Sequence, residues 1–374
     1  MTTLTTPDAP GSTLPRFAAQ APAYFAEALM ARFELRPNQA RRAMAALARH
    51  HLVAGMDWPQ ACAALPRQVR EIIDQVTAGA TVLHLQEVAG SGDATQKLLF
   101  RTEDGLLIES VIIPSEGGRA QGRTTLCVSS QVGCGRRCRF CETGVNGLVR
   151  QLRADEIVAQ FRQARLFWEQ ERKDAPPLSN VVFMGMGEPL DNLEAVLAAI
   201  EVLTDDLVYG LAARRITVST VGVADRIGPF LARSKAHLAV SLNAPDDARR
   251  SALMPVARRC DLATLKRSLV QGLQPGRDVL IEYILFAGFN DSAADALLLL
   301  AFLEGLPARV NLIPANPGPD PNLRQPEPAA VLAFQRQLLD AGARAMVRYP
   351  HGREVGGACG QLAGRRRQGG GQSV

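Results

Sequence analysis

The chain has 374 residues, 47% of them hydrophobic, so it can bury one large α/β core and a smaller appendage. Its net charge of +5 is compatible with an anionic partner such as RNA, but a balance this mild does not identify one. The seven cysteines are an odd number and three of them are clustered, which argues against a disulfide framework and favours a reducing cytoplasm.

The N-terminal residues 1–20 are rich in Thr, Pro and Ala, and we expect them to be disordered. They contain no basic segment followed by an apolar run, so they do not resemble a secretory signal. The longest apolar stretch, residues 293–306, is too short to span a bilayer and contains Glu304, so we expect a buried amphipathic helix. The sequence therefore predicts a cytoplasmic protein that makes no membrane contact.

The remaining segments differ in their hydrophobic pattern. Residues 21–80 carry apolar side chains at helical spacing and predict a helical accessory domain. Residues 81–118 contain short strand-like runs separated by glycine-bearing turns, which predict a β-rich linking segment. Residues 119–364 alternate strand-like runs with longer helical segments and form the predicted core. Residues 365–374 are a basic tail that we expect to be flexible.

The predicted core contains a series of widely spaced strand-like runs. Strands joined by helices form a parallel sheet, so the pattern predicts an α/β fold that is a partial or full barrel. The number of runs leaves a six-stranded and an eight-stranded barrel open. In such folds the chemistry lies at the C-terminal ends of the strands. The predicted strands are residues 123–130, 180–187, 214–222, 237–244, 278–288, 309–316 and 344–350.

Three cysteines follow the first predicted strand with the spacing C-x3-C-x2-C: Cys134, Cys138 and Cys141. Structural zinc normally takes four protein ligands, and no His or Cys near enough completes such a set. Three incidental core cysteines this close together would be unusual. The pattern therefore favours a 4Fe-4S cluster held by three thiolates, which leaves one iron open to a substrate.

This spacing, with Phe140 just before the last cysteine, resembles the signature of radical S-adenosylmethionine (SAM) enzymes. The resemblance implies a partial (βα)6 radical SAM barrel. It also implies that the open iron chelates the amino and carboxylate groups of SAM, which one electron then cleaves to a 5′-deoxyadenosyl radical.

The segment "FMGMGEPLDN" (183–192) ends the second predicted strand. It is not a dinucleotide fingerprint, because Leu190 stands where G-x-G-x-x-G needs its third glycine. Gly187 and Glu188 resemble the element with which radical SAM enzymes bind the amino group of SAM. A tight strand-to-helix turn is the alternative interpretation of the same residues.

Six motifs in order carry a closer resemblance: "TLCVSSQVGCGRRCRFCETG", "VFMGMGEPLDN", "ITVSTVG", "LAVSLNAPDD", "VNLIPANP" and "ACGQLAG". With these motifs, which cover about residues 100–365, the chain resembles the RlmN/Cfr family of radical SAM RNA adenosine methyltransferases. The resemblance implies methylation of an adenine carbon of 23S rRNA or tRNA, with C2 favoured over C8. It further implies two SAM molecules per turnover, an electron donor such as flavodoxin, and a monomer.

The family's chemistry assigns roles to isolated cysteines. One cysteine receives a methyl group from a first SAM, and the radical from a second SAM removes hydrogen from that methyl. The methylene radical attacks the adenine, and a second cysteine releases the product by forming a disulfide with the first. Carried over, the methyl carrier is Cys359, the resolving thiol is Cys127 and the proton acceptor is Glu109. Without the resemblance, Cys127 would be interpreted as a small core residue and Glu109 as a solvated carboxylate.

The family's SAM contacts also carry over to positions at the strand ends. The glycines beside Cys359 predict a loop able to move between two positions, whereas Cys62 and Cys260 match nothing and are interpreted as structural or incidental. The SAM contacts implied by the resemblance are Gly187, Glu188, Ser219, Ser241, Leu242, Asn243 and Asn316.

Some positions depart from the family. Glu142 stands where a small residue is expected beside the cluster. This departure keeps open a C8-methylating Cfr-like enzyme or a paralogue with another RNA target, and it leaves the reaction class unchanged. Two other classes are separate alternatives: a radical SAM enzyme acting on a non-RNA substrate and, last, a non-catalytic metal-binding RNA protein. Arginines near the cysteine cluster could position phosphates, although solvated surface arginines are the alternative. They are Arg136, Arg137, Arg139, Arg150 and Arg153, with Arg365, Arg366 and Arg367 after the carrier cysteine.

Overall fold

The computed structural model describes residues 26–27, 29–31, 34–52, 67, 70, 83–115, 122–172 and 175–362. The predicted disordered N-terminus, Cys62 and the predicted basic tail lie outside the described residues. Of the segment predicted to be helical, the structure describes α2 (Pro37–Leu52), which contacts α6 of the core. No helix in the described part of the chain is long and apolar enough to cross a membrane.

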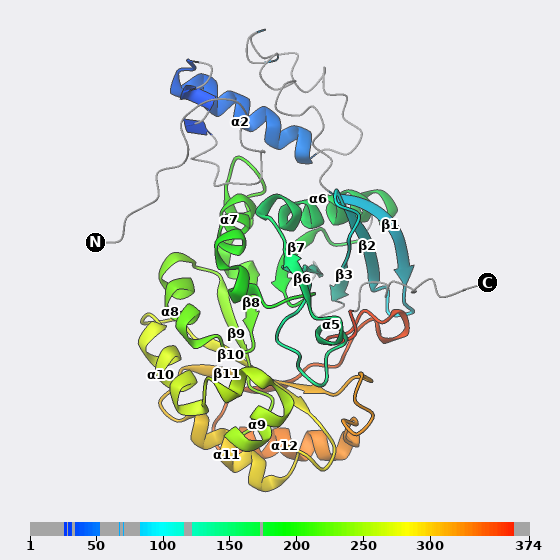
Figure 1. Cartoon of the computed structure of the whole chain (residues 1–374), viewed down its shortest axis with the longest axis vertical. Coiled ribbons are helices and arrows are strands. Elements are labelled where there is room, and N and C mark those ends of the chain that lie inside the picture. Colours follow the sequence, from blue (N-terminus) through cyan, green and yellow to red (C-terminus); the bar gives the residue numbers. More distant parts are fainter. Residues whose placement is uncertain are drawn as a thin grey trace, which may run out of the picture.

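A mixed sheet in the order β1-β2-β3-β4-β7-β8-β9-β10-β11-β12 forms the body of the protein (Figure 1). Its first three strands are antiparallel and continue directly into β4, so the predicted linking segment extends the same sheet as the core. These strands are β1 (Leu83–Gly90), β2 (Gln96–Thr102) and β3 (Leu107–Ser115).

From β4 onward every neighbouring pair of strands in this sheet is parallel. This confirms the predicted α/β class, and all seven predicted strands are present, each ending earlier than the sequence suggested because its last residues turn into the loop that follows. The strands are β4 (Arg123–Cys127), β7 (Leu178–Phe183), β8 (Ile216–Thr220), β9 (His237–Ser241), β10 (Val279–Leu285), β11 (Ala308–Pro314) and β12 (Ala345–Val347).

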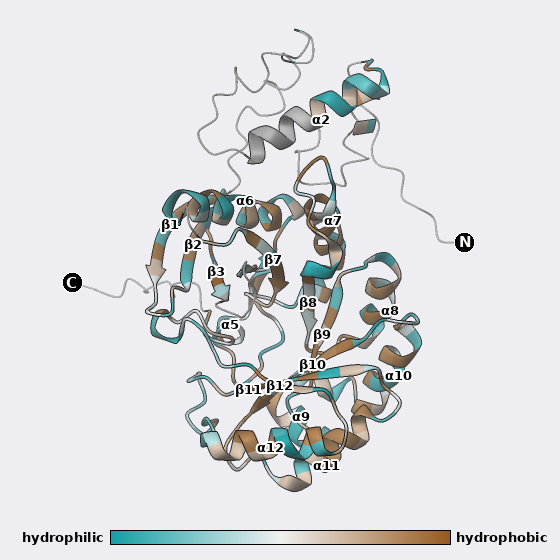
Figure 2. Cartoon of the chain, turned by 180° about the vertical axis from the view of Figure 1, so that it is seen from behind, coloured by the Kyte–Doolittle hydropathy of each residue, from teal (hydrophilic) through white to brown (hydrophobic). Residues whose placement is uncertain are grey.

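Helices connect the parallel strands and cover the sheet. Because both faces of a parallel sheet are buried, apolar residues are frequent in its strands, as the brown parts of the sheet in Figure 2 show. The helices are α6 (Ala154–Glu171), α7 (Leu193–Thr204), α8 (Ala224–Arg233), α9 (Asp247–Leu253), α10 (Leu262–Gly272), α11 (Ala293–Leu303) and α12 (Pro328–Asp340). Short 3-10 turns are η1 (Pro189–Asn192), η2 (Ala213–Arg215), η3 (Pro255–Arg258) and η4 (Arg353–Val355).

The longest apolar stretch forms α11, as predicted, but the helix is not buried all round. Leu299 and Phe302 face the core, while Leu297 is 60% exposed and Leu298 is 45% exposed. The expectation of a buried helix was therefore wrong for its outer face, because α11 packs on the sheet from one side only.

A small hairpin that the sequence did not predict stands beside the main sheet. β5 (Gln131–Gly133) pairs antiparallel with β6 (Leu148–Gln151), and the short helix α5 (Glu142–Val145) lies between them. Gly133 adopts φ +77°, and a Cβ there would lie 1.9 Å from the carbonyl oxygen of Gly147, so only glycine fits. The hairpin closes the chain around the segment that holds the three clustered cysteines.

Candidate active site

The cluster loop, residues 134–141, is held by backbone hydrogen bonds at both ends. Cys134 N donates to Gly147 O at 2.8 Å, and Cys141 N donates to Cys138 O at 3.1 Å. Between them, Arg139 N donates to Leu253 O at 3.0 Å and ties the loop to the end of α9. The loop is therefore fixed to both the hairpin and the core.

The three thiols of the cluster loop lie within eight residues of one another and are of the donor type that holds a 4Fe-4S cluster. In the described part of the chain, no three His, Cys, Asp or Glu side chains are grouped to hold one metal ion. A 4Fe-4S cluster instead takes one thiolate at each of several irons, so its cysteines stand further apart. Burial, with a contribution from the neighbouring Cys141, raises the pKa of Cys134 to about 12. A bound cluster would supply the positive charge that converts such thiols to thiolates.

Glu188 lies beyond the end of β7 and is only 2% exposed. Its two carboxylate oxygens accept hydrogen bonds from backbone groups of different segments, from Leu190 N at 2.9 Å and from Val221 N at 2.9 Å. Gly187 before it has φ +106°, where a Cβ would lie 2.6 Å from the side chain of Gln131. The strand-to-turn geometry is thus present, and it also holds a buried carboxylate at the edge where SAM is predicted to bind.

Burial raises the pKa of Glu188 to about 7 despite the backbone hydrogen bonds that it accepts. Because this value lies above the ordinary 4.5, folding takes up a proton between the two, and stability falls as the pH rises through that range. We expect the cofactor-free protein to lose up to about 3 kcal/mol relative to Glu188→Gln between pH 4.5 and pH 8. Urea denaturation of both proteins across this range measures the difference, and a difference that does not change with pH would contradict the prediction.

The other predicted SAM contacts lie at the same edge of the sheet. Ser219 and Ser241 are at the C-terminal ends of β8 and β9. Asn243 follows with φ +57°, and its Oδ1 accepts from Ile284 N at 3.0 Å. Asn316 behaves differently, because its Nδ2 donates to the carbonyl oxygen of Cys359 at 3.0 Å. In this structure Asn316 therefore contacts the predicted methyl carrier.

The carrier loop, residues 351–362, bridges the two ends of the sheet. Gly352 N donates to Asp93 Oδ2 at 2.9 Å, and Gly92 N donates to Glu354 Oε2 at 3.0 Å. These contacts join the segment after β12 to the turn between β1 and β2, and Figure 1 shows the red C-terminal segment beside these strands. Side chains and loop backbone thus connect the β12 end of the sheet to the β1 end.

The same loop also contacts the cluster loop. Glu142 N donates to Gly360 O at 2.8 Å, so the residue that departs from the family serves as a backbone anchor. Gly360 has φ +83°, and a Cβ there would lie 3.0 Å from Phe140 O. This glycine therefore permits close approach of the two loops, whereas the predicted movement of the carrier loop stays a prediction.

Cys127 and Cys359 line one small cavity of 30 Å³. A space of this size holds a group on the scale of a water molecule. Burial raises the pKa of Cys127 to about 12, with a contribution from the nearby Cys359, while the guanidinium of Arg348 acts in the opposite direction. Both cysteines are free thiols in this structure. Apolar side chains form much of the rest of the lining, with Asn316, Arg348 and His351 as its polar members. The aliphatic residues and Met that line it are Ile113, Val182, Met184, Ile313, Ala358 and Leu362.

Glu109 lies on β3 and is 5% exposed, so the alternative of a solvated carboxylate is wrong. Its Oε1 forms an ion pair with Lys97 Nζ at 3.4 Å. Lys97 Nζ would lie 3.6 Å from a Cβ at Gly356, which brings this pair under the carrier loop. The structure thus brings Glu109, Cys127 and Cys359 to one side of the sheet.

Comparisons with known proteins give the same picture. A family model described as the radical SAM superfamily matches residues 128–301. A "Probable RNA methyltransferase sce1580" from Sorangium cellulosum is 57% identical over 285 residues, which cover 76% of this chain and 70% of that protein. A "Dual-specificity RNA methyltransferase RlmN" from Anaeromyxobacter dehalogenans is 41% identical over 302 residues, which cover 80% of each chain.

The crystal structure of a radical SAM methyltransferase from Sphaerobacter thermophilus is 36% identical, with a TM-score of 0.81, and the match covers 93% of this chain and 99% of that one. The chain belongs to the radical SAM RNA methyltransferase family. This membership confirms the predicted family, and it implies that a 4Fe-4S cluster and SAM are the cofactors.

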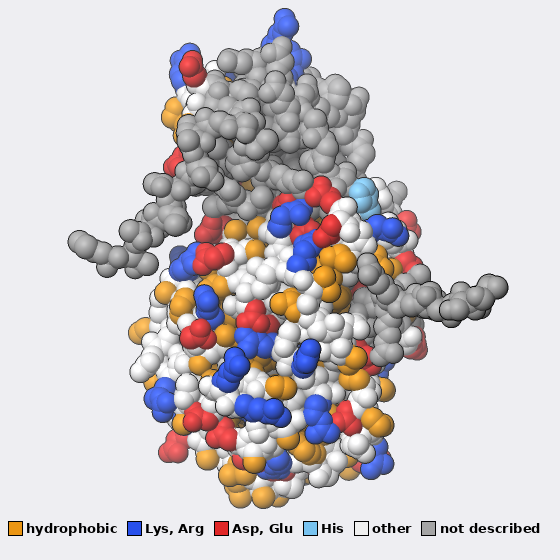
Figure 3. Space-filling model, viewed as in Figure 1, with side chains coloured by type: hydrophobic (Ala, Val, Ile, Leu, Met, Phe, Trp, Pro, Cys, Tyr) orange, Lys and Arg blue, Asp and Glu red, His pale blue; other side chains and the backbone are white. Residues whose placement is uncertain are grey.

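In this radical SAM methyltransferase, most arginines near the cluster loop have carboxylate partners. Arg136 Nε donates to Asp191 Oδ2 at 2.7 Å, and Arg139 forms an ion pair with Asp320. Arg137, in contrast, is exposed, and no partner for its side chain occurs among the residues the structure describes. On the face shown in Figure 3, many Lys and Arg side chains likewise lie beside Asp or Glu. Arginines that are paired with carboxylates are less available to bind phosphates, so the prediction that they position phosphates is less well supported for Arg136 and Arg139.

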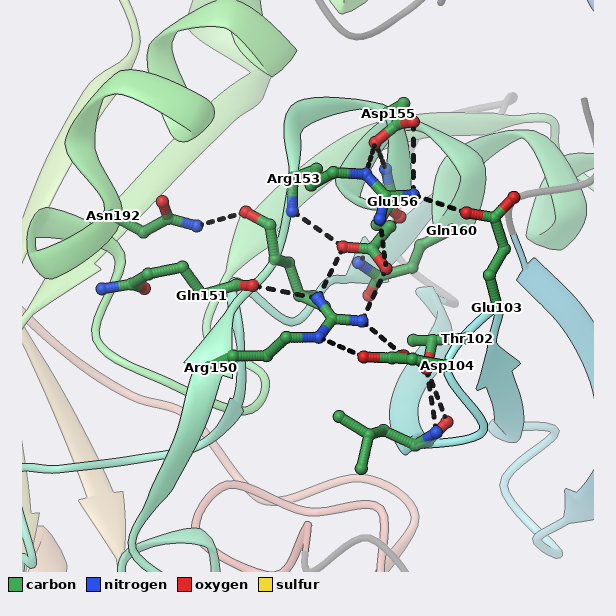
Figure 4. Close-up of polar contacts among 12 residues, drawn as sticks. Thr102, Glu103, Asp104, Arg150, Gln151, Arg153, Asp155, Glu156, Gln160 and Asn192 are labelled. Carbon is green, nitrogen blue, oxygen red and sulfur yellow. Dashed lines mark hydrogen bonds and ion pairs between the residues drawn. The ribbon is translucent and has the colours of Figure 1, made fainter.

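Arg150 is the centre of a network that the sequence did not reveal (Figure 4). Its guanidinium donates to both oxygens of Asp104 at 2.7 Å and to the oxygens of Glu156 at 2.8 and 2.9 Å. These bonds hold the pKa of Asp104 well below its usual range. Because Arg150 lies on β6, Asp104 in the β2–β3 turn and Glu156 on α6, the network ties the cluster hairpin to the sheet.

We expect Arg150→Met to destabilise the fold by about 3 kcal/mol, because the carboxylate of Glu156, which is 0% exposed, would lose both hydrogen bonds from Arg150 and keep, of its ion pairs, only the longer one with Arg153. The matched control is Arg165→Met, which removes an exposed i,i+4 pair with Glu169 and is expected to cost less than about 1 kcal/mol. Urea denaturation of both variants tests this. Equal losses of unfolding free energy in the two variants would show that the network around Arg150 does not add to the stability of the fold.

Proposed function

We propose that this chain is a radical SAM methyltransferase that adds a methyl group to an adenine carbon of RNA, with C2 favoured, through a methyl-cysteine at Cys359. The observation that carries the proposal is the cavity shared by Cys359 and Cys127, whose carrier loop is bonded to the cluster loop. In this proposal one thiol receives the methyl group, and the second, which lines the same cavity, resolves the product.

The residues present fit the cofactors of the family. We propose that Cys134, Cys138 and Cys141 hold the cluster, which when bound supplies the electron that cleaves SAM to the 5′-deoxyadenosyl radical. Glu188 lies buried at the adjacent strand end and offers a carboxylate to the amino group of SAM. Asn316 positions Cys359 through its carbonyl oxygen. The remaining SAM contacts proposed are Gly187, Ser219, Ser241, Leu242 and Asn243.

Glu109 is proposed as the proton acceptor at the adenine. Its Oε1 lies 3.4 Å from Lys97 Nζ, and a carboxylate is a side chain that can act as a general base. Glu109 lies on the same side of the sheet as Cys127 and Cys359, which supports this role. An RNA substrate, two SAM molecules per turnover, a flavodoxin-like electron donor and a monomer complete the proposal.

The test is an anaerobic reaction of the iron-reconstituted full chain with SAM, a reductant and unmodified rRNA and tRNA. Digested nucleosides are then analysed by mass spectrometry. 2-Methyladenosine would support the proposal, whereas 8-methyladenosine would replace it by the Cfr-like activity. Formation of 5′-deoxyadenosine without either product would exclude the RNAs tested. Absence of both cluster and SAM cleavage would overturn the whole proposal.

A further inference from the structure

Arg250 on α9 is a fully buried cation without an anionic partner. Its side chain is 0% exposed. Nη1 donates to Cys260 O at 3.2 Å and Nη2 donates to Val221 O at 2.6 Å, while Nε has no hydrogen-bond partner. Among the residues that the structure describes, no carboxylate forms an ion pair with it. A buried guanidinium in this condition is costly, because its charge is desolvated and not compensated.

The neighbouring residue shows that carboxylates are available on this helix. Arg249 forms ion pairs with Asp246 and Asp295 and is exposed enough to be solvated as well. Arg250 points the other way, into the core, and Gly222 leaves room for it, since a Cβ there would lie 2.9 Å from Nη2. Arg250 thus lacks an ion-pair partner among the described residues because its side chain points into the core, away from the carboxylates that pair with Arg249.

That place adjoins the cluster loop. Leu253 and Met254, which follow Arg250 on the same segment, pack with Cys138 in one buried apolar cluster. Leu253 O also accepts the backbone hydrogen bond from Arg139. The charge of Arg250 acts on Cys138, where it opposes the negative contributions of Cys134, Cys141 and Glu188. Arg250 therefore adds a buried positive charge close to the cluster loop.

We propose that Arg250 is the internal counter-charge of the iron–sulfur cluster at Cys134, Cys138 and Cys141, and that it makes the cluster easier to reduce. This inference rests on the cluster assigned in the proposed function. A cluster held by three thiolates gains a negative charge when it accepts an electron. A fixed buried cation beside it stabilises that reduced form, because charge, burial and hydrogen bonds around the sulfurs set the reduction potential.

The first test is the midpoint potential of the reconstituted full-length protein, measured without SAM by dithionite titration followed by electron paramagnetic resonance. We expect Arg250→Met to make reduction at least tenfold less favourable, which is about 59 mV more negative for a one-electron couple. Arg250→Lys, which keeps the charge, is expected to recover part of the shift. The matched control is Arg277→Met, because Arg277 also donates only to backbone carbonyls, Ser234 O among them.

The possible outcomes separate the explanations. An unchanged potential in an iron-loaded Arg250→Met protein would overturn the inference. Weaker SAM binding with an unchanged SAM-free potential would also overturn it, since Arg250 would then serve the carboxylate of SAM. A wild-type chain that takes up no cluster would overturn the proposed function as well, and this result is visible before any variant is made.

A second measurement remains informative if the variant loads iron poorly. In the iron-free protein the charge of Arg250 is buried without an ion-pair partner among the described residues, so its removal should outweigh the loss of the donor to Cys260 O and Val221 O, and we expect Arg250→Met to be at least as stable as wild type in urea. Arg277→Met is expected to lose stability, because Leu231 O and Ser234 O would lose their donor. A large loss of iron-free stability in Arg250→Met would assign Arg250 a purely structural role.

Discussion

Replacement of Cys359 by alanine is expected to reduce methylated adenosine to background while SAM cleavage continues. The change removes only the sulfur that would carry the methyl group. The carrier loop should keep its shape, because it is held through backbone atoms, by Asn316 Nδ2 to Cys359 O and by Glu142 N to Gly360 O. The measurement is mass spectrometry of nucleosides and of 5′-deoxyadenosine from the same reaction.

Two further variants make this result specific. Cys260→Ala removes another buried free thiol, outside the cavity, and should leave both products unchanged. Cys127→Ala should instead leave RNA attached to Cys359, because the thiol across the cavity would no longer release it, and the complex should be visible on a denaturing gel. Methylation that survives in Cys359→Ala would show that the cysteine does not carry the methyl group.

Replacement of Cys138 by alanine is expected to lower bound iron and sulfide to the level of the unreconstituted protein. Cys138 is buried at the centre of the cluster loop, and two thiolates cannot hold the cluster as three do. Both SAM cleavage and methyl transfer should be lost with it. Iron analysis and the visible absorbance of the anaerobic protein give the result.

The controls are the two cysteines of the cavity and the one outside it. Cys127→Ala, Cys359→Ala and Cys260→Ala should each bind iron like wild type. A Cys138→Ala protein that retains a full cluster, or a Cys260→Ala protein that loses it, would show that the ligands have been assigned wrongly.

Much of this architecture is visible in the sequence, since apolar runs spaced along the chain mark the parallel strands. The cysteine spacing and the short motifs also name the residues that meet at the strand ends. The β5–β6 hairpin escaped prediction because its strands have only three and four residues, too few for a periodic pattern, so that hydrogen bonds and Gly133 define it instead.

The electrostatic features could not be predicted for a different reason. Whether Arg150 faces solvent or the carboxylates of Asp104 and Glu156 depends on segments that meet only in the folded protein. The same holds for Arg250, whose sequence neighbour Arg249 has identical chemistry but pairs with Asp246 and Asp295. The sequence shows charges, whereas their partners are a property of the tertiary structure.

The closure of the sheet by the carrier loop has a consequence for the order of folding. The contacts that close it join residues 263 positions apart, Ser91 and Glu354, and 258 positions apart, Asp93 and His351. Contacts of such long range form late, because the intervening chain must be ordered first. In a chain emerging from the ribosome, Cys127 leaves well before Cys359, which lies 232 residues further along the chain. The two thiols can therefore meet only after almost the whole chain has been synthesised.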